Sequence, residues 1–150
     1  MNIVLFEPEI PNNTGNIGRL SLASGSTLHL VKPFGFDISD KRVKRAGLDY
    51  WKHLDLIIYD DIEHYFAVNK GCEMAFLSSH GAQRYTKIPY SEDIHLIFGK
   101  ESNGLGDQIR SKYGMQLYKI PIMSEHIRSM NIANAVSIVV YEGIRQLTAT

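Results

Sequence analysis

The chain of 150 residues has only one cysteine, Cys72, so it cannot form an internal disulfide or a Cys-x-x-Cys metal site. This usage suits a reducing compartment, and Cys72 is predicted to be a small buried side chain rather than a nucleophile. No apolar stretch approaches the ~20 residues that span a bilayer, and the first residues lack the basic and apolar regions of a signal peptide. We therefore expect a cytoplasmic protein with no membrane segment.

The excess of positive charge that most nucleic-acid-binding domains carry is also absent. The chain has 16 basic and 16 acidic side chains, so its net charge is zero. A local basic stripe is nevertheless present in the sequence, because Lys41, Arg42, Lys44 and Arg45 lie within one short segment. Such a group is either a solvated helix face or a set of phosphate contacts. On charge alone, the solvated face is favoured.

Several common site patterns are missing. The six histidines form no His-x-x-x-His pair and have no cysteine neighbour, so no metal site is predicted. The Gly-x-Gly-x-x-Gly motif, a Walker A loop and a Gly-x-Ser-x-Gly elbow are absent. The first of these absences argues against an oxidoreductase that binds a nicotinamide cofactor. His80 and His126 fall in predicted loops, where a solvated histidine is favoured over an acid–base group.

Short apolar runs alternate with helix-like stretches along the chain. The runs are bounded by Pro, Gly, Asp or Ser, which is typical of strands buried on both faces of a parallel sheet. The predicted strands are residues 3–6, 27–31, 56–59, 74–77, 94–98 and 117–120. The predicted helices are residues 15–24, 40–47, 61–68, 105–112 and 131–147. This order predicts one α/β domain over residues 1–150, with a parallel sheet flanked by helices.

The last predicted helix has the clearest pattern. Apolar residues recur three and four positions apart along residues 132–147, which predicts one broad buried face. Ser129 or Asn131 can cap the start of this helix. A second stripe on its flank consists of Asn134, Ile138 and Tyr141. A helix with two such faces can pack against its own sheet and also against a partner.

Three segments rich in Gly, Asn and Ser follow predicted strands: residues 11–19 (PNNTGNIGR), 98–106 (FGKESNGLG) and 120–131 (IPIMSEHIRSMN). In an open parallel sheet, ligands bind beyond the carboxyl ends of the strands, so these segments are predicted to be ligand loops. Arg19 falls near the start of a helix, where a cation is electrostatically unfavourable. We interpret Arg19 as held for a phosphate or a developing oxyanion, and the alternative is a surface arginine.

Together and in this order, the three segments resemble the motifs of the SPOUT class of RNA methyltransferases. The similarity covers nearly the whole chain and is closest to the tRNA (cytidine/uridine-34) 2′-O-methyltransferase family. Each motif alone is a weak signal, and together they are highly specific. The matching residues are 5–11 (LFEPEIP), 13–17 (NTGNI), 41–50 (KRVKRAGLDY), 128–131 (RSMN) and 139–142 (VVYE).

The resemblance implies a fold and an activity that the residue patterns alone do not give. Family members carry a C-terminal trefoil knot, which is rare among proteins, and form homodimers through their first and last helices. They transfer a methyl group from S-adenosylmethionine (AdoMet) to the ribose 2′-OH of wobble nucleotide 34 in leucine tRNAs, without a metal. The alternatives are a 2′-O-methyltransferase for another tRNA or rRNA position and a non-catalytic RNA-binding factor.

The resemblance also implies the residues of the site. Arg19 matches an arginine linked to the substrate phosphate and the ribose hydroxyl, while Asn131 and Tyr141 match positions tied to catalysis or RNA binding. At Ile127 the family pattern has a small polar residue instead. The residues expected to contact RNA are Lys41, Arg42, Lys44 and Arg45. The residues expected to bind AdoMet are Leu77, Gly99, Glu101, Gly104, Ile120, Ser129 and Met130.

Overall fold

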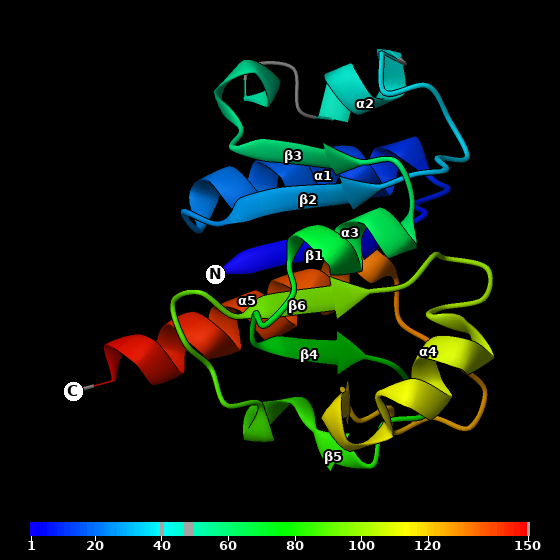
Figure 1. The fold of residues 1–150 in the computed structure, drawn as a ribbon, viewed down its shortest axis with the longest axis vertical. Helices are drawn as coiled ribbons and strands as arrows, with labels where there is room; N and C mark the ends of the chain where they lie inside the picture. Colours follow the sequence, from blue (N-terminus) through cyan, green and yellow to red (C-terminus); the bar gives the residue numbers. More distant parts are fainter. Residues whose placement is uncertain (40, 47–49, 150) are drawn as a thin grey trace.

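The computed structural model describes residues 1–39, 41–46 and 50–149. Its centre is a seven-stranded sheet in the order β3-β2-β1-β6-β4-β7-β5, in which every neighbouring pair is parallel. The long strands therefore run in the same direction in Figure 1. The strands are β1 (Asn2–Phe6), β2 (Thr27–Val31), β3 (Leu56–Tyr59), β4 (Met74–Leu77), β5 (Gln83–Arg84), β6 (His95–Phe98) and β7 (Leu117–Lys119).

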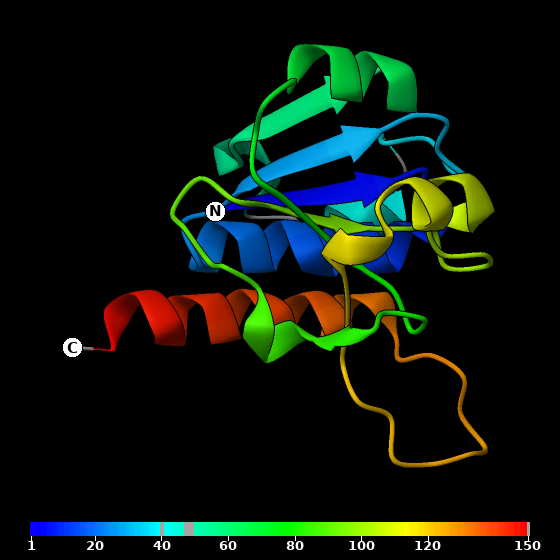
Figure 2. The ribbon, with the colours of Figure 1, turned by 60° about the horizontal axis from the view of Figure 1, so that its bottom comes forward.

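Helices cover both faces of the sheet (Figure 2). They are α1 (Pro11–Ala23), α2 (Lys41–Ala46), α3 (Ile62–Val68), α4 (Gly106–Lys112) and α5 (Ile132–Thr148). α1 and α5 lie side by side on one face, and α2 packs against α1. α3 and α4 pack on the other face. This arrangement confirms the predicted α/β fold with a parallel sheet flanked by helices.

Each face of the sheet has its own apolar cluster. Successive side chains along a strand point to opposite faces, so Ile3 and Leu5 of β1 pack with α1 and α5. Val4 and Phe6 of the same strand pack with α3 and α4. All four side chains are almost fully buried. Burial on both faces explains why the central strands read as continuous apolar runs.

The sequence predicted the six longer strands to within one residue at each end, and missed only the two-residue strand β5 among the described strands. The first helix was placed wrongly, because α1 begins at Pro11 and not at residue 15. Proline suits the first position of a helix, where its missing N–H has no helical partner. Residues 11–19 are therefore helical, as predicted for residues 15–19, and the prediction that residues 11–14 form a loop is wrong. For the helix predicted over residues 40–47, both end residues lie outside the described residues.

Cys72 is exposed, so the prediction that it is buried is wrong. It lies in the turn between α3 and β4, where Gly71 has a φ of 88°. The Cys72 N–H donates to the Asn69 carbonyl oxygen at 3.2 Å, which closes this turn at the surface. The buried part of the following apolar run begins only at Ala75.

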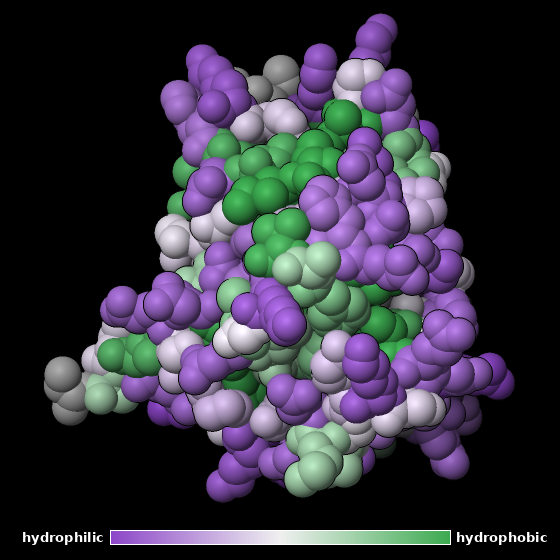
Figure 3. Space-filling view, in the orientation of Figure 1, coloured by the Kyte–Doolittle hydropathy of each residue, from purple (hydrophilic) through white to green (hydrophobic). Residues whose placement is uncertain are grey.

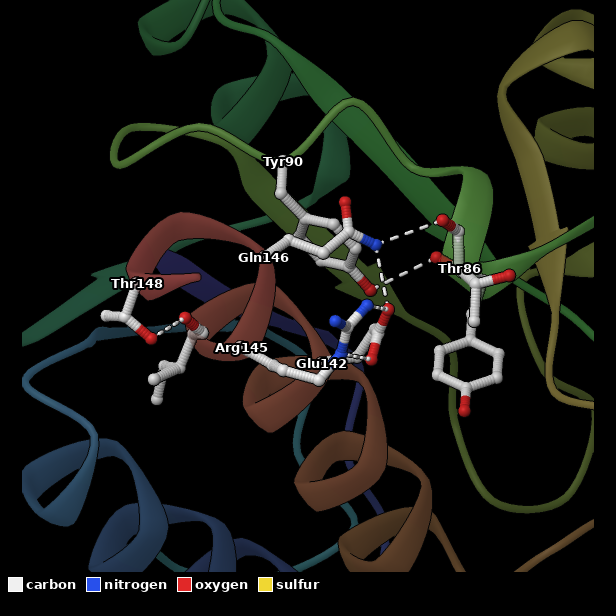
Figure 4. Close-up of polar contacts among 8 residues, drawn as sticks. Thr86, Tyr90, Glu142, Arg145, Gln146 and Thr148 are labelled. Atoms are coloured by element: carbon white, nitrogen blue, oxygen red, sulfur yellow. Dashed lines mark hydrogen bonds and ion pairs between the residues drawn. The ribbon is translucent and has the colours of Figure 1, made fainter. Parts of the chain in front are cut away.

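Polar contacts fix the C-terminal half of α5 against the segment that precedes β6 (Figure 4). Gln146 Nε2 donates to the Thr86 carbonyl oxygen at 3.0 Å and to Glu142 at 2.8 Å. The Tyr90 hydroxyl donates to a neighbouring backbone carbonyl oxygen at 3.1 Å. Arg145 donates two hydrogen bonds to Glu142, and they are the main cause that lowers the pKa of this carboxyl to about 2. The far end of α5 is thereby anchored.

Exposed apolar surface gathers at the sheet edge formed by β3. Ile57 and Ile58 of this strand are 42% and 41% exposed, and Figure 3 shows apolar surface over the same edge.

Within the described ranges, no helix is both long enough and apolar enough to cross a membrane.

Two histidines are buried on the α3 side of the sheet. His29 hydrogen-bonds to the Tyr59 hydroxyl at 2.8 Å and to Asn2 Oδ1 at 3.0 Å. His95 hydrogen-bonds to the Tyr65 hydroxyl at 2.7 Å, and the two imidazole rings lie 5.0 Å apart. Burial is the main cause that lowers the pKa of His29 to about 4, and burial also lowers the pKa of His95. His29 is therefore neutral in the folded protein at neutral pH.

The free energy of unfolding is expected to fall as the pH drops from about 6.5 to 4. The unfolded chain protonates His29 near pH 6.5, whereas the folded chain does so only near pH 4, so protons favour the unfolded state in this window. Urea unfolding at several pH values measures the effect. His29→Gln keeps a hydrogen-bonding amide and should flatten the pH dependence, while the exposed His126→Gln should not. An equal slope in all three proteins would contradict the assignment.

Candidate active site

A cavity of about 580 Å³ opens at the carboxyl ends of β4, β6 and β7. Its walls continue into the turn after β4, the loop after β6 and the segment of residues 120–131. This is the side towards which the strand arrows point in Figure 1. The structure brings all the expected cofactor residues together on this cavity, and Asn131 with them. These residues are Leu77, Gly99, Glu101, Gly104, Ile120, Ser129 and Met130.

Glycines shape the loop after β6. Lys100 and Gly104 exchange two backbone hydrogen bonds, of 2.8 and 3.2 Å, which close a tight turn. A Cβ on Gly99 would lie 2.0 Å from the Gly104 carbonyl carbon, so no side chain fits there. Gly104 and Gly106 have φ values of 61° and 78°, in the left-handed region that favours glycine. The bare backbone of this loop can therefore approach a ligand closely.

The Glu101 carboxylate ties this loop to the segment after β1. Its oxygens accept hydrogen bonds from Glu9 N at 2.8 Å, Ile10 N at 3.1 Å and Asn13 Nδ2 at 3.3 Å. In return, the Glu9 carboxylate accepts from the N–H and the hydroxyl of Ser102, both at 2.8 Å, and these bonds lower the pKa of Glu9. Glu101 already has three donors in this conformation, so it acts as a clamp between the two segments.

Asn131 extends the clamp to α5. Its Oδ1 accepts hydrogen bonds from Ala133 N at 2.9 Å and Asn134 N at 3.3 Å, which caps the helix. Of the two predicted caps, Asn131 is the one observed. Its Nδ2 donates to Asn13 Oδ1 at 3.0 Å, and Asn13 in turn donates to Glu101. One chain of hydrogen bonds therefore joins the three segments that carry the predicted motifs.

The turn after β4 belongs to the cavity but was not recognised from the sequence. Ser78 N donates to the Tyr118 carbonyl oxygen at 2.9 Å, and a Cβ on Gly81 would lie 2.5 Å from the Tyr118 carbonyl carbon. The turn is therefore held tightly against β7, and Ser78, Ser79 and His80 line the cavity. His80 is exposed, as predicted. The available signal was the place of this turn directly after a predicted buried strand.

Basic side chains dominate the charged residues on the cavity wall. Lys100 Nζ lies 3.0 Å from the Glu7 carboxylate, which raises the pKa of Lys100. Arg110 pairs with Asp107, while Arg128 is exposed and forms no ion pair with another described residue. Arg128 is therefore the cation on the wall that is placed to meet a negative group of a ligand. Across the described residues, no group of three or more His, Cys, Asp or Glu is placed to hold a metal ion.

Arg19 and Tyr141 do not line the cavity of their own chain. Arg19 is exposed on α1, six residues beyond Asn13 and therefore about 9 Å further along the helix. Tyr141 is 50% exposed on α5, ten residues beyond Asn131 and therefore about 15 Å further along. A single chain thus does not bring the three expected catalytic residues together.

The four basic residues expected to contact RNA lie on the surface of α2. Val43, between them, is fully buried and anchors the helix. The exposed residues are Lys41, Arg42, Lys44 and Arg45. This placement fits both a solvated face and a phosphate-binding face.

The parallel α/β fold, the glycine-shaped loop and the cavity at the carboxyl edge of the sheet together define a ligand-binding α/β protein. A family model described as the SpoU rRNA Methylase family matches residues 1–141. The chain therefore belongs to this family. The resemblance to SPOUT methyltransferases is confirmed.

Particular relatives narrow the comparison. The chain is 42% identical over 153 aligned positions to a tRNA (cytidine(34)-2'-O)-methyltransferase from Yersinia pestis, with 98% of this chain and 94% of that protein covered. A solved structure described as "Structural insights into the 2-OH methylation of C/U34 on tRNA" is 38% identical, with a TM-score of 0.94 and coverage of 99% and 97%. The SpoU methyltransferase AviRb from Streptomyces viridochromogenes, solved with AdoMet, shares the fold at 22% identity, with a TM-score of 0.82 and coverage of 98% and 57%.

Glu101→Gln is expected to lower the free energy of unfolding by roughly 1.5–3 kcal/mol, because hydrogen bonds to a charged group are lost. The glutamine amide has only one acceptor oxygen, so one of the two backbone N–H groups that Glu101 holds loses its partner. Urea unfolding measures the change. Glu125→Gln, in the exposed segment after β7, is the matched control. If the two variants are equally stable, Glu101 is not a clamp.

Proposed function

We propose that the protein transfers a methyl group from AdoMet to the ribose 2′-OH of cytidine or uridine 34 in tRNA, with leucine tRNAs as substrates. The observation that carries this proposal is the cavity formed by the three motif segments in a chain of the SpoU methylase family. The names of relatives that cover nearly the whole chain support nucleotide 34 as the target.

The residues on the cavity wall fit AdoMet. Leu77, Ile120 and Met130 offer apolar contacts for a flat ring, and the glycine loop offers backbone groups that no side chain shields. A cavity of this size lies in the range of small-molecule sites. Arg128 on the wall suits the carboxylate of the methionine part. The bound cofactor would supply an activated methyl group on a sulfonium.

Methyl transfer to a ribose hydroxyl is an in-line displacement, in which the oxygen–carbon bond would form as the carbon–sulfur bond breaks and S-adenosylhomocysteine leaves. The protein must therefore align the oxygen, the methyl carbon and the sulfur. Alignment of this kind contributes up to about 7–11 kcal/mol in favourable cases. The Glu101–Asn13–Asn131 chain would hold the two sides of the cavity in register for this purpose. The hydroxyl must also lose its proton. A guanidinium is a poor base, so Arg19 would stabilise the developing alkoxide or hold the adjacent phosphate.

A second copy of the chain would complete the site. Arg19 and Tyr141 are exposed on α1 and α5, which lie side by side on one face. A homodimer that packs these two helices against those of a partner would bring residues of one subunit near the cavity of the other. The half-exposed side chain of Tyr141 and the partly exposed Ile138 give this face some apolar area.

We also propose that the chain has a C-terminal trefoil knot, that residues 1–150 form one domain, and that the protein is cytoplasmic. Strand β7 lies between β4 and β5 in the sheet. After β7, the chain lines the cavity beside the loop that follows β6, and it then returns as α5 on the same side of the sheet as α1. This path supports a threaded C-terminal segment in a single domain of residues 1–150. The exposed thiol of Cys72 suits the reducing cytoplasm.

Arg19→Ala is expected to abolish methylation, because the developing charge on the ribose oxygen loses its partner. AdoMet binding should survive, because Arg19 would act on the ribose oxygen or the phosphate of the tRNA and does not line the cavity of its own chain. Arg19→Lys should restore little activity if a planar, two-point contact is needed. Methyl transfer to tRNA and calorimetric AdoMet binding measure these outcomes. Normal turnover by Arg19→Ala would refute the role.

Removal of the α2 cations is expected to weaken tRNA binding and to flatten its salt dependence. Each lost phosphate contact lowers the slope of log K against log salt by about 0.7–0.9. Alanine at positions 41, 42, 44 and 45 should therefore change the slope, which binding titrations at several salt concentrations measure. Lys70 and Lys112, both exposed on the α3 and α4 side, provide the control pair. An unchanged slope in the α2 variant would leave only the solvated-face interpretation.

A further inference from the structure

Tyr50 lies directly beside Arg19. The guanidinium carbon of Arg19 is 4.8 Å from the centroid of the Tyr50 ring, within the range of a cation–π contact. We propose that Tyr50 is a positioning residue, which holds the Arg19 guanidinium in the orientation that the substrate requires. This inference rests on the proposed role of Arg19 in methyl transfer.

Close packing between α1 and the 3-10 helix η1 (Trp51–His53) fixes the place of Tyr50. A Cβ on Gly18 would lie 2.9 Å from Trp51 Cζ3, so the indole rests directly on the backbone of α1. The N–H of His53 donates to the Tyr50 carbonyl oxygen at 2.8 Å, which secures the backbone on the other side. The Trp51 indole packs against α1 at Gly18. Tyr50, the residue before Trp51, is thereby placed beside Arg19, the residue after Gly18.

A ring contact holds a guanidinium without using its hydrogen-bond donors. A carboxylate partner would occupy N–H groups and neutralise the charge. An aromatic face attracts the cation through its quadrupole and leaves all five N–H donors available. Among the described residues, Arg19 has no hydrogen bond or ion pair. The guanidinium is thus oriented, charged and open to a phosphate or a developing alkoxide.

The test compares two substitutions at Tyr50 in steady-state methylation of tRNA. Tyr50→Leu removes the ring and is expected to lower kcat roughly tenfold to a hundredfold, because a misplaced charge stabilises the transition state poorly. AdoMet affinity and the Tm should stay near those of the unchanged protein. Tyr50→Phe keeps the ring face and should retain most of the activity. His53→Ala, in the same turn, controls for local disturbance.

A double-mutant cycle with Arg19→Lys tests whether Tyr50 acts through Arg19. An ammonium has no plane to orient, so Tyr50→Leu should cost much less in the Arg19→Lys protein. Equal losses in both backgrounds would overturn the proposal, and so would a loss confined to the KM for tRNA, which would mean that Tyr50 contacts RNA itself. Full activity of Arg19→Ala would remove the role of Arg19. An inactive Arg19→Ala beside a fully active Tyr50→Leu would remove only that of Tyr50.

Discussion

The site depends on one chain of hydrogen bonds that runs from Glu101 through Asn13 to Asn131. Asn13 is 88 positions from Glu101 and 118 positions from Asn131, so only the folded sheet brings the three residues together. Helix α1 begins without a capping side chain of its own and without an acidic residue in its first turn. The Glu101 carboxylate lies at this positive end and accepts the N–H groups that precede the helix. One anion thus stabilises α1, ties the glycine loop to the segment after β1 and, through the two asparagines, fixes the start of α5.

The sequence predicted most of the sheet because burial on both faces leaves a plain mark, a short run of apolar residues. It failed where tertiary contacts overrode local preference. Residues 11–14 are rich in Asn and were predicted to be a loop before a helix from residue 15, yet α1 begins at Pro11 and buries Gly15 and Gly18. Position 18 is a glycine because the Trp51 ring packs directly on its backbone. This contact joins positions 33 residues apart, and no local sequence pattern shows it. The prediction that Cys72 is buried was wrong for a different reason, because the turn that contains Cys72 lies at the surface.

The site was predictable to the extent that it consists of motifs. The residues expected to bind AdoMet gather on one cavity. What the motifs could not show is how each residue is used, because the partners are distant in sequence. Glu101 read as a ligand contact, and its oxygens are engaged by backbone groups of another segment. Arg19 was expected near the start of a helix and close to the ligand. It lies on the surface of α1 beside an aromatic ring, and it does not line the cavity of its own chain.

The central claim is that this cavity serves methyl transfer to the ribose of nucleotide 34. The most direct measurement incubates the purified protein with AdoMet carrying a labelled methyl group and with an unmodified leucine tRNA, and then maps the labelled nucleotide. The account predicts one 2′-O-methyl group at position 34, and none when that nucleotide carries a 2′-deoxyribose. Label at another position, on a base, or absent from tRNA while AdoMet binds normally would contradict it.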